Sequence, residues 1–198
     1  MTMTREEEDK LVTADLNRLG MDVASVFDLM KWKQPYPAAV PVLLEHLSRV
    51  QDEGIKAGIV RALTAKEALG KADAALVAEF RAVPPSQKAN LGLKWTIANA
   101  LSVVATDAVF ADLVELSRDK RNGRSREMLA VALGKMKNPA AVDVLIELLN
   151  DEELAGHALM GLGKLKAQKA RPHIENFLNH PKPWVRKEAS KALAKLNK

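Results

Sequence analysis

The chain has 198 residues, of which 47% are hydrophobic, 28% charged and only 4% aromatic, with a formal net charge of +5 and no cysteine. This composition is typical of a folded globular protein with one or two domains. The absence of cysteine excludes disulfide frameworks, thiolate zinc sites, iron–sulfur clusters and cysteine nucleophiles.

The sequence also argues against insertion into a membrane. Its longest stretch without Asp, Glu, Lys or Arg is the twelve residues from Trp95 to Thr106, whereas a spanning helix needs about 20 apolar residues. The start of the chain carries Glu6, Glu7, Glu8 and Asp9 where a secretory signal has positive charge followed by an apolar stretch. We therefore expect a cytoplasmic protein without a membrane partner.

The charge is unevenly distributed along the chain. Residues 1–117 have a net charge of −3, and residues 118–198 have a net charge of +8. A bias of this kind bears on association with anionic partners and says nothing about the fold. Lysines that only solubilise a helical surface give the same bias, so both interpretations stay open.

Taken in chain order, the predicted elements are all helices. Apolar residues recur at relative positions 0, 4, 7, 8 and 11, which form one face of an α-helix. The predicted helices cover one or two atypical elements within 5–33, then 37–47, 55–66, 93–104, 106–116, 125–136, 139–149, 154–165, 170–178 and 185–196.

Two segments alternate through the chain and define a repeat. The segment 125–136 matches 154–165 at an offset of 29, and 154–165 matches 185–196 at an offset of 31. A second segment, 139–149, matches 37–47, with Pro139 in the first helical turn and Asn138 as a candidate N-cap. Each repeat is therefore a helix hairpin. We predict an all-α protein of about five hairpins, with residues 1–36 as capping helices and 37–198 as the repeat array of a single domain.

This hairpin pattern resembles HEAT-like repeats, and its unit of about 30 residues is similar to the short phycobilisome-lyase type. The resemblance covers about residues 37–198 and implies a right-handed α–α superhelix, a solenoid whose concave surface binds partners. The residues that carry it are Leu133, Gly134, Pro139, Val142, Leu145, Leu148, Leu149, Leu162, Gly163, Val185, Arg186, Ala189, Ala192, Leu193 and Leu196.

No catalytic or cofactor motif emerges from the sequence. It lacks H-E-x-x-H, an EF-hand loop, G-x-S-x-G and the dinucleotide glycine pattern. Gly161, Gly163 and Lys164 do not complete a phosphate loop, and we interpret the glycines as sites where neighbouring helices approach closely. The four histidines are expected to be solvated or capping, and we predict no metal, no cofactor and no catalytic residue.

Helical spacing predicts a partner-binding groove on the second helices of the hairpins. Positions 2, 6 and 9 should face the concave side if positions 0, 4, 7, 8 and 11 are buried. A mixed apolar and charged stripe is typical of a protein interface. A buried stripe, or a register error of one residue, stays open as an alternative. The predicted groove residues are Arg61, Trp95, Asn99, Glu127, Val131, Met160, Lys187 and Lys191.

A second candidate is the basic loop around an Asn-Gly turn within 117–126. Its cations could contact phosphate or another anion, or could simply be solvated. The loop residues are Arg118, Lys120, Arg121, Arg124 and Arg126.

The sequence thus favours a non-enzymatic interaction module or scaffold that holds a protein partner in the groove, anchored by Trp95, Val131 and Met160. The alternative is nucleic-acid binding, chiefly of DNA, through the basic C-terminal half. A lyase or chaperone activity of the HEAT-like group has the least support.

Overall fold

The computed structural model describes residues 3–84 and 92–197, and this part of the chain is helical without a strand. The chain divides into two compact units, which we call unit 1 (1–84 and 88–105) and unit 2 (85–87 and 106–198). The predicted division into a cap of 1–36 and a repeat array of 37–198 stays a prediction.

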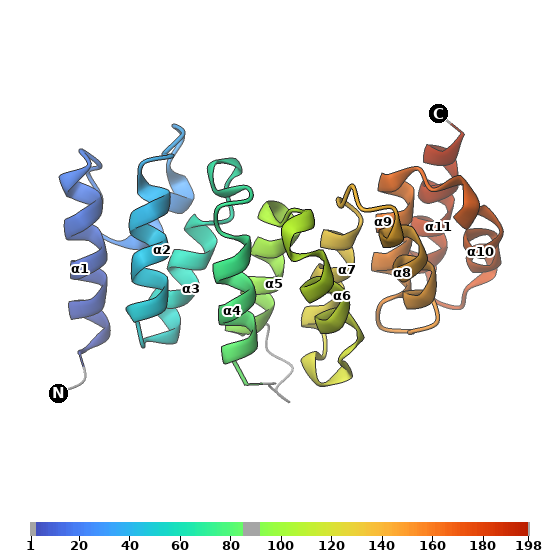
Figure 1. The fold of residues 1–198 in the computed structure, drawn as a ribbon, viewed down its shortest axis with the longest axis horizontal. Coiled ribbons are helices and arrows are strands. Elements are labelled where there is room, and N and C mark those ends of the chain that lie inside the picture. Colours follow the sequence, from blue (N-terminus) through green and yellow to red (C-terminus); the bar gives the residue numbers. More distant parts are fainter. Residues whose placement is uncertain (1–2, 85–91, 198) are drawn as a thin grey trace. The chain divides into compact units, whose positions relative to one another are not determined.

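Unit 1 begins with a terminal helix and continues with two helix hairpins (Figure 1). Helix α2 packs on α3 and α4 on α5, while α3 also packs on α5. A short 3₁₀ helix, η1, lies against α1 and α3. The elements are α1 (Arg5–Arg18), η1 (Val26–Lys31), α2 (Ala39–Arg49), α3 (Glu53–Ala62), η2 (Lys66–Ala68), α4 (Asp73–Ala82) and α5 (Leu93–Val104).

Helix α1 is fixed at both its start and its side. Thr4 and Glu7 form a capping box that satisfies the first backbone N–H groups of the helix. Glu8 is 2% exposed, and its carboxylate accepts hydrogen bonds from the backbone N–H groups of Gln51 and Asp52, both at 2.8 Å. This buried carboxylate is therefore satisfied, and it ties α1 to the turn between α2 and α3.

Unit 2 contains three hairpins whose second helices pack on one another (Figure 1). Helix α6 packs on α7, α8 on α9 and α10 on α11, and α9 contacts both α7 and α11. The elements are η3 (Asp107–Val109), α6 (Phe110–Arg118), η4 (Lys120–Asn122), α7 (Ser125–Leu133), α8 (Ala140–Leu148), α9 (Ala155–Leu165), η5 (Gln168–Ala170), α10 (Arg171–Glu175), η6 (Asn176–Asn179) and α11 (Pro183–Leu196).

The predicted second helices are confirmed at α3, α5, α7, α9 and α11, and five hairpins are present in the described residues. The first helices differ in detail, because 106–116 opens with the 3₁₀ turn η3 and 170–178 divides into α10 and η6. The N-cap of α8 is Pro139, one residue later than the predicted Asn138, although the Asn138 Oδ1 does accept a hydrogen bond from the Ala140 N–H at 3.0 Å. Each unit buries an aliphatic core, built around Leu43, Ile59 and Leu101 in unit 1, and around Leu129, Leu145 and Leu162 in unit 2.

Three glycines of unit 2, Gly134, Gly161 and Gly163, lie where neighbouring helices touch. A Cβ on Gly134 would stand 2.3 Å from the Gly161 Cα, and a Cβ on Gly163 would stand 2.8 Å from the Ala192 Cα. Real Cβ atoms do not approach so closely, so these contacts require the missing side chain. The interpretation of these glycines as close-approach sites is confirmed.

Within residues 3–84 and 92–197, no helix is both long and apolar enough to cross a membrane.

Candidate functional site

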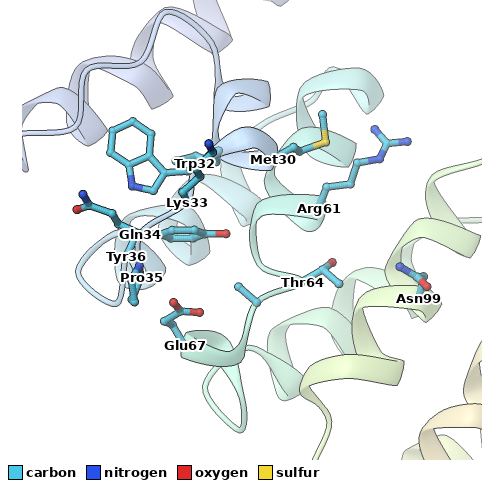
Figure 2. A pocket seen from close by; sticks show the side chains of 12 residues that line it. Met30, Trp32, Lys33, Gln34, Pro35, Tyr36, Arg61, Thr64, Glu67 and Asn99 are labelled. Carbon is cyan, nitrogen blue, oxygen red and sulfur yellow. The ribbon is translucent and has the colours of Figure 1, made fainter.

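A cleft of about 590 Å³ opens in unit 1 beside the C-terminal end of α3 (Figure 2). One wall is the segment 29–36, which runs from η1 toward α2 and carries Trp32 and Tyr36. Arg61 of α3 and Asn99 of α5 lie across from these aromatic side chains, with Thr64 between the two sides. The cleft is therefore aromatic on one side and polar on the other.

The aromatic wall is anchored to the helices around it. Ser25 caps η1, and its hydroxyl donates to Oδ2 of Asp9 in α1 at 2.7 Å. The Tyr36 hydroxyl donates to the Ala62 carbonyl at 2.8 Å, which satisfies a backbone acceptor at the end of α3. Burial raises the pKa of the Tyr36 hydroxyl, so the side chain stays a neutral donor at physiological pH.

Several polar side chains of this cleft have no ion-pair or hydrogen-bond partner among the described residues. Within the described residues, Lys33, Arg61 and Glu67 form no ion pair, and the side-chain amide of Asn99 makes no hydrogen bond. Asn99 is half-buried, whereas Arg61 is exposed. An amide can donate and accept at once, and a guanidinium binds carboxylates through two parallel hydrogen bonds. The cleft can therefore bind a polar chain that also carries negative charge.

Two predicted groove residues, Arg61 and Asn99, line this cleft, but the predicted anchor Trp95 does not. Trp95 is half-buried, and its Nε1 is buried without a hydrogen-bond partner among the described residues. The aromatic wall escaped prediction, since Trp32 and Tyr36 lie in an irregular segment without helical period. The sequence K-W-K-Q-P-Y-P, with two aromatics and two prolines, was the available signal.

The other predicted groove residues lie in unit 2, where their exposure varies. Val131 and Glu127 are half-buried, and Met160 is 39% exposed. Lys187 and Lys191 are exposed, with Nζ of Lys191 2.6 Å from an oxygen of Glu188. Since the two sets of residues belong to different units, a groove that joins them stays a prediction.

The register of the predicted groove requires a correction at its ninth position. Ser102, Gly134 and Gly163 are buried, as is Gly156 at the second position of its helix, although all four were expected to face the concave side. The glycines contact the next helix or a ring, as the close approaches at Gly134 and Gly163 show. At the ninth position, Ser102, Gly134 and Gly163 are therefore buried, whereas Thr64 of the first repeat and Ala194 of the last are not.

A second cleft, of about 510 Å³, lies in unit 2 beside α9 and α11. The ring of Trp184 covers Gly156, where a Cβ would stand 1.9 Å from the ring. The Trp184 ring also meets the His157 ring at 5.4 Å between centroids and a tilt of 56°. Glu127 lines this cleft and is paired with Nε of Arg124 at 3.0 Å.

Two of the four histidines differ from the expectation that they are solvated or capping. His46 is 8% exposed, and its Nε2 lies 2.8 Å from Oδ2 of Asp15, a hydrogen bond that lowers the pKa of Asp15. His157 is half-buried, and its Nδ1 has no partner among the described residues. His173 is exposed, and His180 accepts a hydrogen bond from the Lys182 N–H at 3.2 Å.

The basic loop is largely neutralised by carboxylates of unit 2. Arg118 forms two hydrogen bonds to Glu147, and Arg121 lies 2.8 Å from Asp119. Lys120 is exposed and has no ion pair among the described residues.

Arg126 requires a correction as a candidate anion contact. Its side chain is 3% exposed, and its guanidinium lies 2.6 Å from oxygens of both Asp151 and Glu153. A buried guanidinium that is already paired holds the start of α7 to the turn before α9 and cannot receive a ligand from solvent.

Comparison with known protein families finds repeats in the C-terminal part of the chain. Residues 150–198 match the family model of HEAT repeats, and residues 125–151 match that of the PBS lyase HEAT-like repeat. A comparison of the chain with curated proteins found no match. The matches of residues 125–198 support a HEAT-like repeat family for this part of the chain, and the helices of the described residues are consistent with an α–α solenoid. HEAT repeats generally mediate protein–protein interaction. The right-handed sense of the superhelix stays a prediction.

Proposed function

We propose that the protein is a non-enzymatic interaction module and that the unit 1 cleft binds an extended segment of a partner protein. The observation that carries this proposal is the uncommitted amide of Asn99 across from Trp32 and Tyr36. A half-buried amide without a partner is available to hold the N–H and C=O groups of a peptide backbone.

The rest of the cleft supplies contact area and charge. Trp32 and Tyr36 offer large, rigid surfaces, which are the residue types that contribute most energy at interfaces. Arg61 is free to pair with a carboxylate of the partner. Trp95, Val131 and Met160 stay proposed as further anchors, and nothing in the cleft depends on them.

The proposal is tested by substitutions in the cleft. Arg61→Ala with Asn99→Ala should reduce the capture of a partner from host lysate by about tenfold, because a charged and an amide contact are both lost. Cross-linking mass spectrometry should place the wild-type partner at the segment 29–36 and at α3. The control is Lys71→Ala with Ser48→Ala, two exposed residues of unit 1 outside the cleft. Unchanged capture by the cleft variant, with helicity preserved in circular dichroism, would contradict the proposal.

Nucleic-acid binding is the alternative function, and the paired arginines of the basic loop weigh against it. Binding through phosphates must weaken steeply with added salt. If neither duplex nor single-stranded DNA binds in about 50 mM salt, this alternative is excluded. A lyase or chaperone activity has no observation in its favour.

A further inference from the structure

Three lysines occupy the same position in the successive hairpins of unit 2. Lys135, Lys164 and Lys195 follow the repeat offsets of 29 and 31 residues and lie at or just beyond the C-terminal ends of α7, α9 and α11. All three side chains are exposed. The corresponding positions in α3 and α5 are Ala65 and Val103, so this lysine row is specific to unit 2.

Close helix contacts bring the lysine row together. The Gly134 and Gly161 backbones bring α7 against α9, and the Lys195 Cδ lies 3.6 Å from where a Cβ on Gly163 would stand. Gly134 directly precedes Lys135 and Gly163 directly precedes Lys164. Partial burial and, to a lesser extent, the nearby Lys164 ammonium lower the pKa of Lys135. The row therefore gathers like charges.

No carboxylate balances the lysine row. Within the described residues, none of the three lysines forms an ion pair, whereas every arginine of unit 2 donates to an oxygen of the protein. The arginines are Arg118, Arg121, Arg124, Arg126, Arg171 and Arg186. The arginines therefore contact other groups of the protein, whereas the ammonium groups of the lysine row are available to solvent or to a partner of opposite charge.

The acidic start of this chain does not supply that partner, because its carboxylates are engaged. Glu6 pairs with Lys10, and Glu7 caps α1. Glu8 holds the backbone N–H groups of Gln51 and Asp52, while Asp9 accepts from Ser25 and from the Val26 N–H. The occupant must therefore come from another protein.

We propose that the lysine row binds an extended acidic segment of a partner protein. Packed helices lie about 8–10 Å apart. Carboxylates on one face of an extended chain recur about every 6.8 Å, and every third residue of a polyproline II segment recurs at about 9.3 Å. The spacing of about 9.3 Å matches successive helices directly, and the spacing of about 6.8 Å falls about 1–3 Å short of it, a difference that the long lysine side chains span.

A nucleic acid fits the lysine row less well than an acidic peptide. Single-strand binders place aromatic rings among the cations so that bases stack. Trp184 is eleven residues before Lys195 on α11, which corresponds to about 16 Å along a helix. This surface lies wholly in unit 2, so it goes beyond the proposed cleft and does not depend on it.

The test compares two triple variants of the full chain by fluorescence anisotropy. The probe is a labelled peptide of alternating Glu and Ser, and labelled oligo-dT of equal charge is the second probe. Lys135→Gln, Lys164→Gln and Lys195→Gln together should weaken peptide binding by about tenfold or more. The control triple, Lys137→Gln, Lys166→Gln and Lys182→Gln, removes the same charge from exposed, unpaired lysines of unit 2 that belong neither to the row nor to the predicted groove or basic loop, and it should change binding less than about twofold.

Each outcome decides the proposal. The proposal is overturned if the wild type shows no measurable peptide binding, or if both triples weaken binding equally. It is also overturned if oligo-dT binds more tightly than the peptide and that binding depends on the lysine row. The row variant loses like-charge repulsion and also the favourable interaction of each ammonium with the C-terminal end of its helix. These two effects oppose each other, so the variant should melt close to the wild type, and loss of binding is separable from loss of fold. In the background of Arg61→Ala with Asn99→Ala, the row triple should weaken peptide binding by the same factor as in the wild-type background, which keeps this test independent of the unit 1 cleft.

Discussion

At the scale of single residues, His157 combines burial with an unsatisfied ring nitrogen. Its Nδ1 has no hydrogen-bond partner among the described residues, and its ring packs against Trp184. Burial lowers the pKa of His157 below its ordinary 6.5; the carboxylates of Glu127 and Glu188 oppose this shift, and Arg124 adds to it. The folded protein therefore holds a neutral imidazole at physiological pH.

This histidine should lower the stability of the protein at mildly acidic pH. The unfolded chain gains a proton at His157 near pH 6.5, whereas the folded chain resists it, so the free energy of unfolding falls as the pH drops through 6.5. Above that pH both states are neutral and the effect disappears. Between pH 7.5 and pH 5.5, the free energy of unfolding measured in urea should fall less for His157→Gln than for the wild type. His173→Gln, which changes an exposed histidine, should show the same decrease in the free energy of unfolding as the wild type. Equal decreases in the two variants would refute the role of His157.

Sequence reasoning could place individual residues only where the repeat pattern located them. Arg61 and Asn99 were assigned to a binding surface by helical spacing, and both line the unit 1 cleft. Trp32 and Tyr36 were missed because their segment has no period. The burial of Arg126 was also hidden, since its partners Asp151 and Glu153 lie 25 and 27 residues away and only the fold brings them together.

At the scale of elements, the helices of unit 2 approach through backbone instead of through interlocking side chains. Gly134 of the α7 cap meets Gly161 of α9, and Gly163 meets Ala192 of α11. Such contacts leave no flexible side chain that could yield to an added methyl group. The spacing between these helices is therefore set by small residues at defined positions.

A methyl group at Gly134 should destabilise the protein. In Gly134→Ala the new Cβ would stand 2.3 Å from the Gly161 Cα, so α7 and α9 must separate. Overpacking of this kind costs about 1–3 kcal/mol, more than the gain of about 0.4–1 kcal/mol from replacing glycine where φ is negative. Gly161→Ala should cost less, since its Cβ meets the movable Leu145 side chain at 3.0 Å. Urea denaturation gives both values, and an unchanged Gly134→Ala would disprove the close contact.

Most helix positions were predictable because most hairpins repeat one apolar pattern, but α4 (Asp73–Ala82) was not predicted. Pro139 and Asn138 marked the start of α8 within one residue, and the segments 93–104 and 154–165 agree with α5 and α9 within a residue. The division of 170–178 into α10 and η6 was not predictable, because an apolar period of this length fits either an α-helix or a shorter 3₁₀ turn.

At the scale of the whole molecule, the chain divides into two compact units, and each carries one of the two proposed binding surfaces. The cleft with Arg61 and Asn99 belongs to unit 1, and the lysine row belongs to unit 2. The net charge of −3 for residues 1–117 and +8 for residues 118–198 follows a similar division. The excess of positive charge therefore lies in unit 2, where the arginines are paired and several lysines have no ion pair among the described residues.

Unit 2 should fold without unit 1. It contains three hairpins, which is the smallest number that buries a continuous core in a repeat array. A fragment of residues 106–198 should therefore show helical circular dichroism and a cooperative urea transition. A fragment that is unfolded, or that melts without cooperativity, would show that its core depends on residues of unit 1.

The glycine contacts between α7, α9 and α11 have a consequence for recognition. Where helices touch through backbone, they have little freedom to slide or rotate when a ligand arrives. The helices therefore fix where each lysine leaves the backbone before a partner binds, while the flexible lysine side chains still have to be ordered on binding. The selectivity of the lysine row should consequently depend on how the partner spaces its charges relative to these fixed backbone positions.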